Sequence, residues 1–228
     1  MPNRQIAALL PAYNEEPNIK AVIRETKTAL PGALIVVVDD GSKDGTVKIA
    51  KAERVVLLQH KTNKGKGEAL KTGLNYILKK NIAGVVIIDT DRQFEASEAP
   101  KVIEPILNGK ADVVMGRRNL SGIPLRHRLG IWLWKTTFNL FFGTRLADTN
   151  CGFMALSNNA AGKVNIHGGY IIENSMLASA VKEKMRIAQV PVIVHYRKTS
   201  GVRRGIRIVL GVFSFIVIKG LKYRLGYD

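Results

Sequence analysis

The segment at residues 85–93 constrains the fold of this chain more than any other. It begins with four β-branched apolar residues and ends with Asp89, Asp91 and Gln93, spaced two apart. Such a run is typical of a strand buried on both faces, as in a parallel sheet. Ligands of open α/β sheets bind just beyond the carboxyl ends of strands, where two carboxylates suit Mg²⁺ or Mn²⁺. The alternative is an ordinary turn in which each Asp bonds its own backbone.

Similar short apolar runs recur along the chain and alternate with segments of helical spacing. Strands are predicted at 6–10, 34–38, 55–59, 85–88, 112–115, 153–156 and 187–194. This alternation, with short connections, predicts an α/β fold with a doubly wound, mostly parallel sheet flanked by helices. Right-handed crossovers would bring the ends of the first, second and fourth strands to one edge, and all three ends carry polar or acidic clusters.

The composition limits the classes of molecule that this protein is expected to bind and the compartment in which it is expected to work. The chain has 228 residues, 46% of them hydrophobic, which fits one large domain or one domain with an appendage. A net charge of +17 requires a polyanionic partner: nucleic acid, an anionic membrane or a phosphorylated substrate. The single Cys151 excludes an internal disulfide and indicates a reducing compartment, and four scattered His make no zinc pattern. We expect neither a signal peptide nor a membrane-spanning helix.

Two segments of the second half favour contact with a membrane surface. Residues 120–147 contain no acidic side chain, and Arg and Lys alternate there with Trp and Phe. They are predicted to form an amphipathic segment at a membrane interface, with an ordinary core helix pair as an equal alternative. Residues 204–228 are predicted to form a basic membrane-interface tail around the apolar stretch 208–218, with a helix docked on the domain or on a dimer partner as the alternative.

Six motifs occur in a specific order, and together they resemble one family. They are the segments 11–15 (PAYNE), 39–42 (DDGS), 63–67 (NKGKG), 89–93 (DTDRQ), 116–118 (GRR) and 148–153 (DTNCGF). The order and spacing are similar to those of family 2 inverting glycosyltransferases of the GT-A fold, and within them of polyprenyl-phosphate hexose synthases such as dolichyl-phosphate mannose synthase. The resemblance covers roughly residues 5 to 205 and implies a GT-A domain over 1–203.

The resemblance assigns roles to residues of this chain. It implies a nucleotide pocket formed by Pro11, Tyr13, Glu15, Asp40 and Lys66. It implies that a Mg²⁺ or Mn²⁺ ion and the donor diphosphate bind at Asp89, Asp91 and Gln93. Carboxylates are natural ligands for such an ion, which neutralises a diphosphate leaving group.

Arginines are expected on the acceptor side of the site. Arg118 matches the last residue of a Gly-Ser-Arg motif, and Arg117 replaces its serine. Arg126 or Arg128 corresponds to a downstream arginine of the family, and Arg203, or else Arg204, to a basic residue near the end. Together with Arg117 and Arg118 they would hold the acceptor phosphate, because guanidinium groups bind phosphate oxygens through two parallel hydrogen bonds.

The expected reaction is attack by a lipid phosphate on the anomeric carbon of the sugar, with inversion. A phosphate monoester is largely a dianion at pH 7, with a second pKa of about 6, so it needs cationic guidance more than a base. The residues expected to act in catalysis are Asp91, Arg118 and Asp148. Asp148 would position the acceptor or act as a base, and capping of the following turn is an equal alternative.

Several alternatives remain open at this point. GDP-mannose is the favoured donor, with UDP-glucose and UDP-N-acetylglucosamine also compatible, and the acceptor is dolichyl or undecaprenyl phosphate. We expect a peripheral protein on the cytoplasmic face of a membrane, bound to anionic lipid or to a separate membrane-anchoring protein, and no nucleic acid partner. A nucleotidyltransferase is disfavoured because residues 6–20 contain no Gly. A nucleic-acid-binding protein or a membrane scaffold would leave the acidic strand ends unexplained.

Overall fold

The computed structural model describes residues 5–119, 125–195 and 202–227, without the side chains of 125–127, 170 and 202–210. One sheet organises them, and its strands are β1 (Gln5–Ala12), β2 (Leu34–Asp39), β3 (Val56–Gln59), β4 (Ile82–Ile87), β5 (Val113–Arg118), β6 (Met154–Ser157) and β7 (Ile187–Val192). Most boundaries lie within two residues of a predicted strand, but β4 begins three residues earlier and β5 ends three residues later than predicted. The order across the seven-stranded sheet is β3-β2-β1-β4-β6-β5-β7. The expected α/β class is therefore confirmed.

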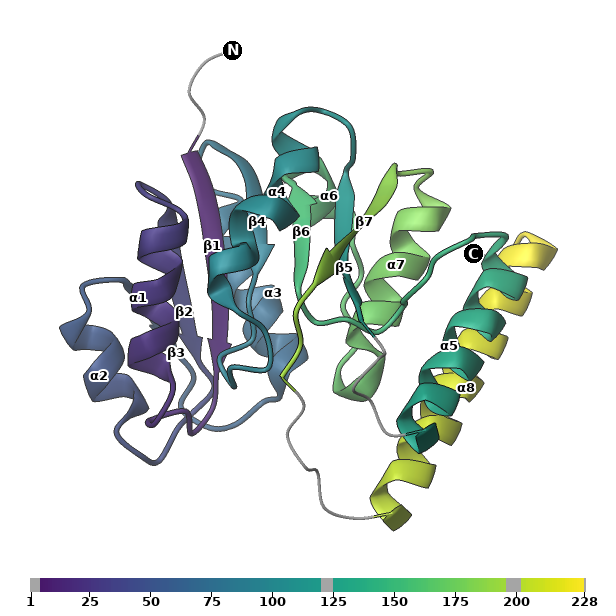
Figure 1. The fold of residues 1–228 in the computed structure, drawn as a ribbon, viewed down its shortest axis with the longest axis horizontal. Coiled ribbons are helices and arrows are strands. Elements are labelled where there is room, and N and C mark those ends of the chain that lie inside the picture. Colours follow the sequence, from purple (N-terminus) through teal and green to yellow (C-terminus); the bar gives the residue numbers. More distant parts are fainter. Residues whose placement is uncertain (1–4, 120–124, 196–201, 228) are drawn as a thin grey trace.

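The direction of the strands brings the loops of the site together. β1 pairs in parallel with β2 and β4, and β2 with β3. β6 alone runs antiparallel to its neighbours, so the segment that precedes it reaches the edge at which the parallel strands end. β5 pairs in parallel with β7. Loops from both halves of the chain therefore meet at one edge of the sheet, below it in Figure 1.

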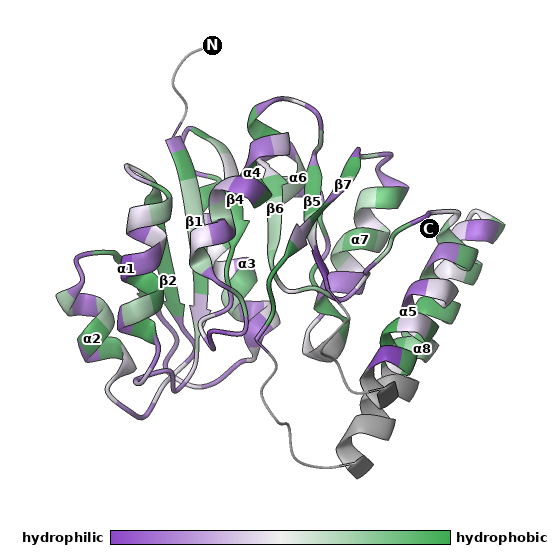
Figure 2. Cartoon of the chain, viewed as in Figure 1, coloured by the Kyte–Doolittle hydropathy of each residue, from purple (hydrophilic) through white to green (hydrophobic). Residues whose placement is uncertain are grey.

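Helices cover both faces of the sheet. The helices are α1 (Ile19–Ala29), α2 (Thr46–Ala52), α3 (Lys66–Ile77), α4 (Ala99–Leu107), α5 (Leu125–Phe142), α6 (Asn158–Lys163), α7 (Ile172–Lys182) and α8 (Val202–Leu225), with short 3₁₀ turns at Ala96–Glu98 and Gly169–Ile171. In Figure 1, α1, α2 and α4 lie in front of the sheet, and α3 and α6 lie behind it. The strands are hydrophobic and the loops at the lower edge are mostly hydrophilic (Figure 2), as expected for a sheet buried on both faces.

The two segments predicted at a membrane interface form helices that pack side by side. α5 and α8 run in the same direction beyond α7 (Figure 1). Phe138 of α5 and Val212 and Ile216 of α8 are buried. Arg224 donates hydrogen bonds to the carbonyl oxygens of Leu140 and, at 3.0 Å, Phe141, so a cation caps the end of α5. α8 is longer than the predicted stretch 208–218, and the predicted boundary between 203 and 204 falls in its first turn.

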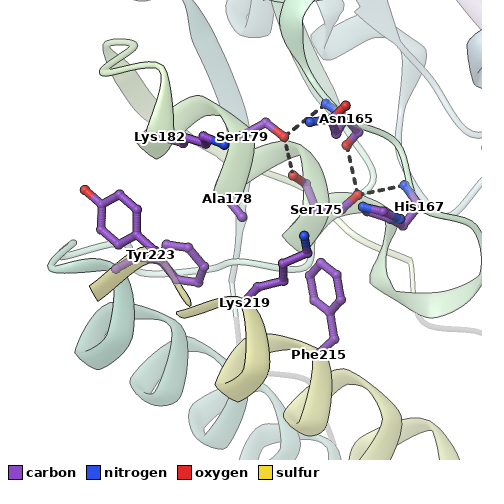
Figure 3. Close-up of a pocket in the computed structure, with 10 residues that line it drawn as sticks. Asn165, His167, Ser175, Ala178, Ser179, Lys182, Phe215, Lys219 and Tyr223 are labelled. Carbon is purple, nitrogen blue, oxygen red and sulfur yellow. Dashed lines mark hydrogen bonds between the residues drawn. The ribbon is translucent and has the colours of Figure 1, made fainter. Parts of the chain in front are cut away.

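α8 also docks on α7, which agrees with the alternative expectation of a helix packed on the domain. Figure 3 shows Phe215 and Lys219 reaching from α8 toward Ser175 and Ser179 of α7, around a small cavity of about 60 Å³. The Ser175 hydroxyl accepts a hydrogen bond from the backbone N–H of His167 at 3.1 Å. One face of α8 is thus covered by protein, while Phe213, Ile218 and Leu221 remain exposed.

Packing of α8 on α5 depends on close approach at Gly220. A Cβ atom there would lie 2.3 Å from the Cβ of Phe141. We expect Gly220→Ala to weaken the helix pair by about 1–3 kcal/mol because the two backbones must separate. Gly211→Ala, in the same helix but with nothing within 4 Å, is expected to stabilise the protein by about 0.5–1 kcal/mol. Thermal denaturation and hydrogen exchange of the α8 amides would measure both, and equal effects would contradict this packing.

Candidate functional site

A cavity of about 680 Å³ lies at the edge of the sheet where the parallel strands end. Its walls are the ends of β1 and β5, the loops after β1, β2, β3 and β4, the start of α3, the loop before β6 and the start of α7. Nine predicted residues line it: Pro11, Tyr13, Glu15, Asp40, Lys66, Asp89, Asp91, Gln93 and Arg118. Asn150, Gly152, Ile172 and Glu173 line it as well. The fold therefore gathers the predicted nucleotide, metal and diphosphate residues around one space.

Other predicted residues lie elsewhere. Arg117 is exposed and does not line the cavity, because neighbouring residues of a strand point to opposite faces. Arg128 is exposed on α5 and also lies outside the cavity lining. The side chains of Arg126 and Arg203 fall outside the described part of the structure. Of the arginines expected to bind phosphate, Arg118 is the one that the described structure places at the cavity.

The turn after β4 holds Asp91 and Gln93 together. Asp91 accepts hydrogen bonds from the backbone N–H of Gln93 at 3.0 Å and from its side-chain amide at 2.7 Å. Arg92, between them, has a φ of 59°, a left-handed conformation that few residues other than glycine adopt. The hydrogen bond from the Gln93 N–H to the Asp91 side chain is that of an Asp turn, so the turn considered as an alternative from sequence is also present at Asp91. The same turn places the carboxylate of Asp91 and the amide of Gln93 at the cavity.

Asp89 pairs with a lysine from a different motif. The Nζ atom of Lys66 lies 2.6 Å from Oδ1 and 2.8 Å from Oδ2 of Asp89, and 3.5 Å from a carboxylate oxygen of Glu173. Burial acts to lower the pKa of Lys66, but the two carboxylates outweigh it and hold the pKa above its ordinary value. Lys66 is therefore a cation within the site. Its partner Glu173 lies far along the sequence, and no local pattern indicates the pairing.

Asp40 organises the basic turn before α3. Its carboxylate accepts hydrogen bonds from the backbone N–H groups of Lys64 at 2.9 Å and Gly65 at 2.7 Å. Its Oδ1 atom also lies 2.6 Å from Nδ1 of His60, whose Nε2 is 2.9 Å from the Thr72 hydroxyl. The sequence pattern did not single out His60. Asp40 thus lies in the predicted pocket, and the bonds described here fix the turn that leads to Lys66.

Arg118 and Asp148 form an ion pair with little exposure to solvent. The guanidinium Nε and Nη2 atoms lie 2.7 Å and 2.8 Å from the two carboxylate oxygens, and the Asp148 side chain is 2% exposed. Asp148 also accepts a bond from the backbone N–H of Asn150 at 3.1 Å, as the capping alternative predicts. It does not line the cavity. Its contacts therefore link it to Arg118 and to the turn, outside the cavity lining, and a role in positioning the acceptor or as a base stays a prediction.

The donor atoms at the cavity fit a hard divalent cation that arrives with a diphosphate. Asp89, Asp91 and Gln93 offer carboxylate and amide oxygens, which Mg²⁺ and Mn²⁺ prefer. Within the described residues, no group of three or more His, Cys, Asp or Glu side chains forms a complete metal site. Mg²⁺ commonly keeps several waters and binds through one or two carboxylates plus substrate phosphates. Such a donor set is therefore sufficient when the substrate supplies the remaining oxygens.

Comparison with known families identifies the chain. The model of the family described as "Glycosyl transferase family 2" matches residues 8–163. The chain belongs to glycosyl transferase family 2. This family 2 protein is a nucleotide-sugar glycosyltransferase, and the recognition made from its motifs is confirmed.

Several relatives are similar over nearly the whole chain. The UDP-N-acetylglucosamine–dolichyl-phosphate N-acetylglucosaminyltransferase of Methanococcus voltae is 32% identical, over 97% of this chain and 98% of its own. An uncharacterised protein, MJ1222, of Methanocaldococcus jannaschii is 31% identical, over 94% of this chain and 92% of its own. The polyprenol monophosphomannose synthase of Mycolicibacterium smegmatis is 24% identical, over 84% of this chain and 77% of its own.

A solved structure supports the GT-A fold. Glucosyl-3-phosphoglycerate synthase from Mycobacterium tuberculosis, in complex with Mn²⁺, UDP and phosphoglyceric acid, superimposes with a TM-score of 0.79. It covers 96% of this chain and 79% of its own chain, at 21% identity. At that identity the likeness shows the fold alone. The expected GT-A architecture is thereby confirmed.

Removal of one member of the Arg118–Asp148 pair should be costly. We expect Asp148→Ala to lower the free energy of unfolding by about 3–5 kcal/mol, because the Arg118 guanidinium, 12% exposed, loses both hydrogen bonds to this carboxylate where little solvent reaches it. Arg186→Met breaks a similar two-bond pair with Asp112 on the surface, where the Arg side chain is 59% exposed, and should cost less than about 1 kcal/mol. Urea denaturation would compare the two. Equal losses would show that burial of the Arg118 pair contributes nothing.

Proposed function

We propose that this protein transfers one sugar from a nucleoside diphosphate sugar to the phosphate of a polyprenyl phosphate, with inversion and with help from Mg²⁺ or Mn²⁺. The observation that carries the proposal is that each carboxylate lining the cavity already has a hydrogen-bond or ion-pair partner. Asp89 and Glu173 pair with Lys66, Asp40 with His60 and two backbone amides, and Asp91 with Gln93. Glu15 accepts a bond from Asn18 at 2.7 Å.

An acceptor hydroxyl would need a general base within hydrogen-bond reach. Each carboxylate that lines the cavity already accepts a bond from a cation, an imidazole or an amide, so none is poised for this role. A phosphate acceptor is already ionised and attacks without deprotonation. The cavity instead offers two cationic side chains, Lys66 and Arg118, which suit phosphate oxygens.

Each group of residues has a separate proposed role. Pro11, Tyr13, Glu15 and the loop held by Asp40 bind the nucleoside, and Asp89, Asp91 and Gln93 hold the metal with the donor diphosphate. The bound ion supplies charge neutralisation for the departing nucleoside diphosphate. Arg118, fixed by Asp148, orients the acceptor phosphate, with which Arg126, Arg128 and Arg203 are proposed to interact as it approaches. Structures of the related synthase from M. tuberculosis in complex with UDP and Mn²⁺ or Mg²⁺ support a divalent cation in this fold.

We propose UDP-N-acetylglucosamine as the first donor to test, ahead of GDP-mannose. The relative named for that donor matches 97% of this chain at 32% identity, while the polyprenol monophosphomannose synthase matches 84% at 24%. Both relatives are named for lipid acceptors of the polyprenol class, which supports the proposed acceptor. UDP-glucose remains the third candidate.

A transfer assay tests this proposal. Purified protein with Mg²⁺ or Mn²⁺ and a polyprenyl phosphate should form a sugar-phosphate lipid from one of the three donors. Chelation of the metal and Asp91→Ala should each reduce the rate by at least about a hundredfold, because charge stabilisation of the leaving group is lost. Glu68→Ala, which removes a carboxylate outside the cavity lining, is the matched control. Transfer to a sugar hydroxyl but not to the lipid phosphate would contradict the acceptor assignment.

We also propose that the protein lies on the cytoplasmic face of a membrane, bound through α5 and α8. Leu129, Trp132 and Leu140 of α5 are exposed, as are Phe213, Ile218 and Leu221 of α8, and Figure 2 shows hydrophobic residues along both helices. Lys and Arg accompany them, which suits anionic headgroups. No helix in the described part of the chain combines the length and hydropathy that crossing a bilayer requires. A separate membrane-anchoring protein on this face is the alternative.

Vesicle binding tests this surface. The protein should sediment with vesicles that contain phosphatidylserine and much less with vesicles of neutral lipid. Trp132→Ala combined with Phe213→Ala should weaken the partition coefficient about tenfold or more, because each exposed aromatic ring would bury apolar area worth about 1–3 kcal/mol. Leu107→Ala, an exposed apolar residue on α4, should leave it unchanged. Equal binding by all three proteins would contradict the proposed surface.

A further inference from the structure

Lys66 takes the place on Asp89 that a divalent cation would take. Its Nζ atom lies 2.6 Å and 2.8 Å from the two oxygens of that carboxylate. A metal ion bound to one carboxylate occupies the same position, in front of one or both oxygens. The ammonium group and the metal ion cannot both hold this position, because both are cations and the space is the same.

Backbone on one side holds Lys66 and Asp89 close together. The open cavity on the other side leaves the lysine side chain room to rotate away. A Cβ atom on Gly152 would lie 2.5 Å from Oδ2 of Asp89 and 3.2 Å from Nζ of Lys66, so backbone closes one side of the pair. The Lys66 backbone is fixed as the first residue of α3, and the next residue, Gly67, packs against Gly168. The side chain is 32% exposed toward the cavity, and a lysine has a long, flexible stem.

A second carboxylate offers the lysine another partner. Glu173, in the first turn of α7, lies 3.5 Å from Nζ and its side chain is 13% exposed. The ammonium group can therefore leave Asp89 for the interior of the cavity without losing every negative neighbour. A donor diphosphate in the cavity would add a third set of anionic oxygens.

We propose that Lys66 is an internal counterion that competes with the divalent cation for Asp89, so that the metal binds Asp89 fully only after a nucleoside diphosphate has drawn the lysine away. This inference rests on the proposed function, because it requires a nucleoside diphosphate in the cavity. After transfer, departure of the nucleoside diphosphate returns Lys66 to Asp89 and weakens the hold on the metal. Lys66 thereby couples metal binding to the presence of donor.

The coupling has a measurable consequence. If diphosphate tightens metal binding, metal must tighten diphosphate binding by the same factor, and such couplings are commonly about 5- to 150-fold. Removal of the ammonium group should uncouple the two ligands in part, since Asp89 would then be open to metal at all times. A residue that only supports the fold would not change metal affinity in this direction.

Binding of Mn²⁺ to the full-length protein, without lipid acceptor, tests the competition. The paramagnetic resonance signal of free Mn²⁺ reports binding with and without UDP or GDP. Lys66→Met should bind Mn²⁺ alone about tenfold more tightly than the wild type, and added nucleotide should increase its affinity by a smaller factor. Lys64→Met removes the same charge from an exposed neighbour in the same turn and should behave as the wild type.

Glu173→Gln provides an independent test with the opposite sign. Without the second carboxylate, Lys66 should remain on Asp89, and Mn²⁺ alone should bind more weakly than to the wild type. The proposal is overturned if folded Lys66→Met binds Mn²⁺ no more tightly than the wild type. If that variant does not fold, unchanged or tighter binding by Glu173→Gln overturns it. Failure of transfer with every donor would overturn the proposed function instead, because the Mn²⁺ measurement requires no acceptor.

Discussion

Parallel pairing of β1 with β2 and β4 is the constraint on which the rest of the structure depends. These three strands are buried on both faces, so their backbone groups must pair within the sheet and their side chains must be apolar. Their polar residues are therefore confined to the loops beyond the carboxyl ends. The cavity forms where those loops meet, and its chemistry follows from which polar residues each loop carries.

Charge is arranged in pairs around this cavity. Lys66 forms ion pairs with Asp89 and Glu173, and Arg118 forms one with Asp148. His60 and two backbone N–H groups form hydrogen bonds with Asp40. The net charge of +17 is therefore not concentrated at the site itself, where five carboxylates line the cavity together with two cationic side chains, Lys66 and Arg118. A diphosphate with its metal ion can enter such a site by exchange of partners rather than by burial of an uncompensated charge. The same pairing of charges therefore underlies both the proposed sugar transfer and the proposed competition between Lys66 and the metal ion for Asp89.

The α5–α8 pair gives the second half of the chain two surfaces. One surface packs inward through Phe138, Val212 and Ile216, and the other leaves Trp132 and Phe213 exposed. A helix can satisfy both expectations drawn from its sequence, docking on the domain and contact with lipid, because its faces are independent. The candidate site and the proposed membrane surface are thus parts of one molecule with separate structural requirements.

The sequence by itself determined the fold class, the order of the strands along the chain and nine of the residues that line the cavity. Period-2 and period-3.6 patterns report local structure, and polar residues at strand ends report an edge of the sheet. Only the tertiary structure decided which side chains meet. The pairing of Lys66 with Glu173 and the burial of Asp148 behind Arg118 depend on contacts between distant segments, which local patterns do not report. Strand alternation separates Arg117 from Arg118, but only the structure shows which of the two lies at the cavity.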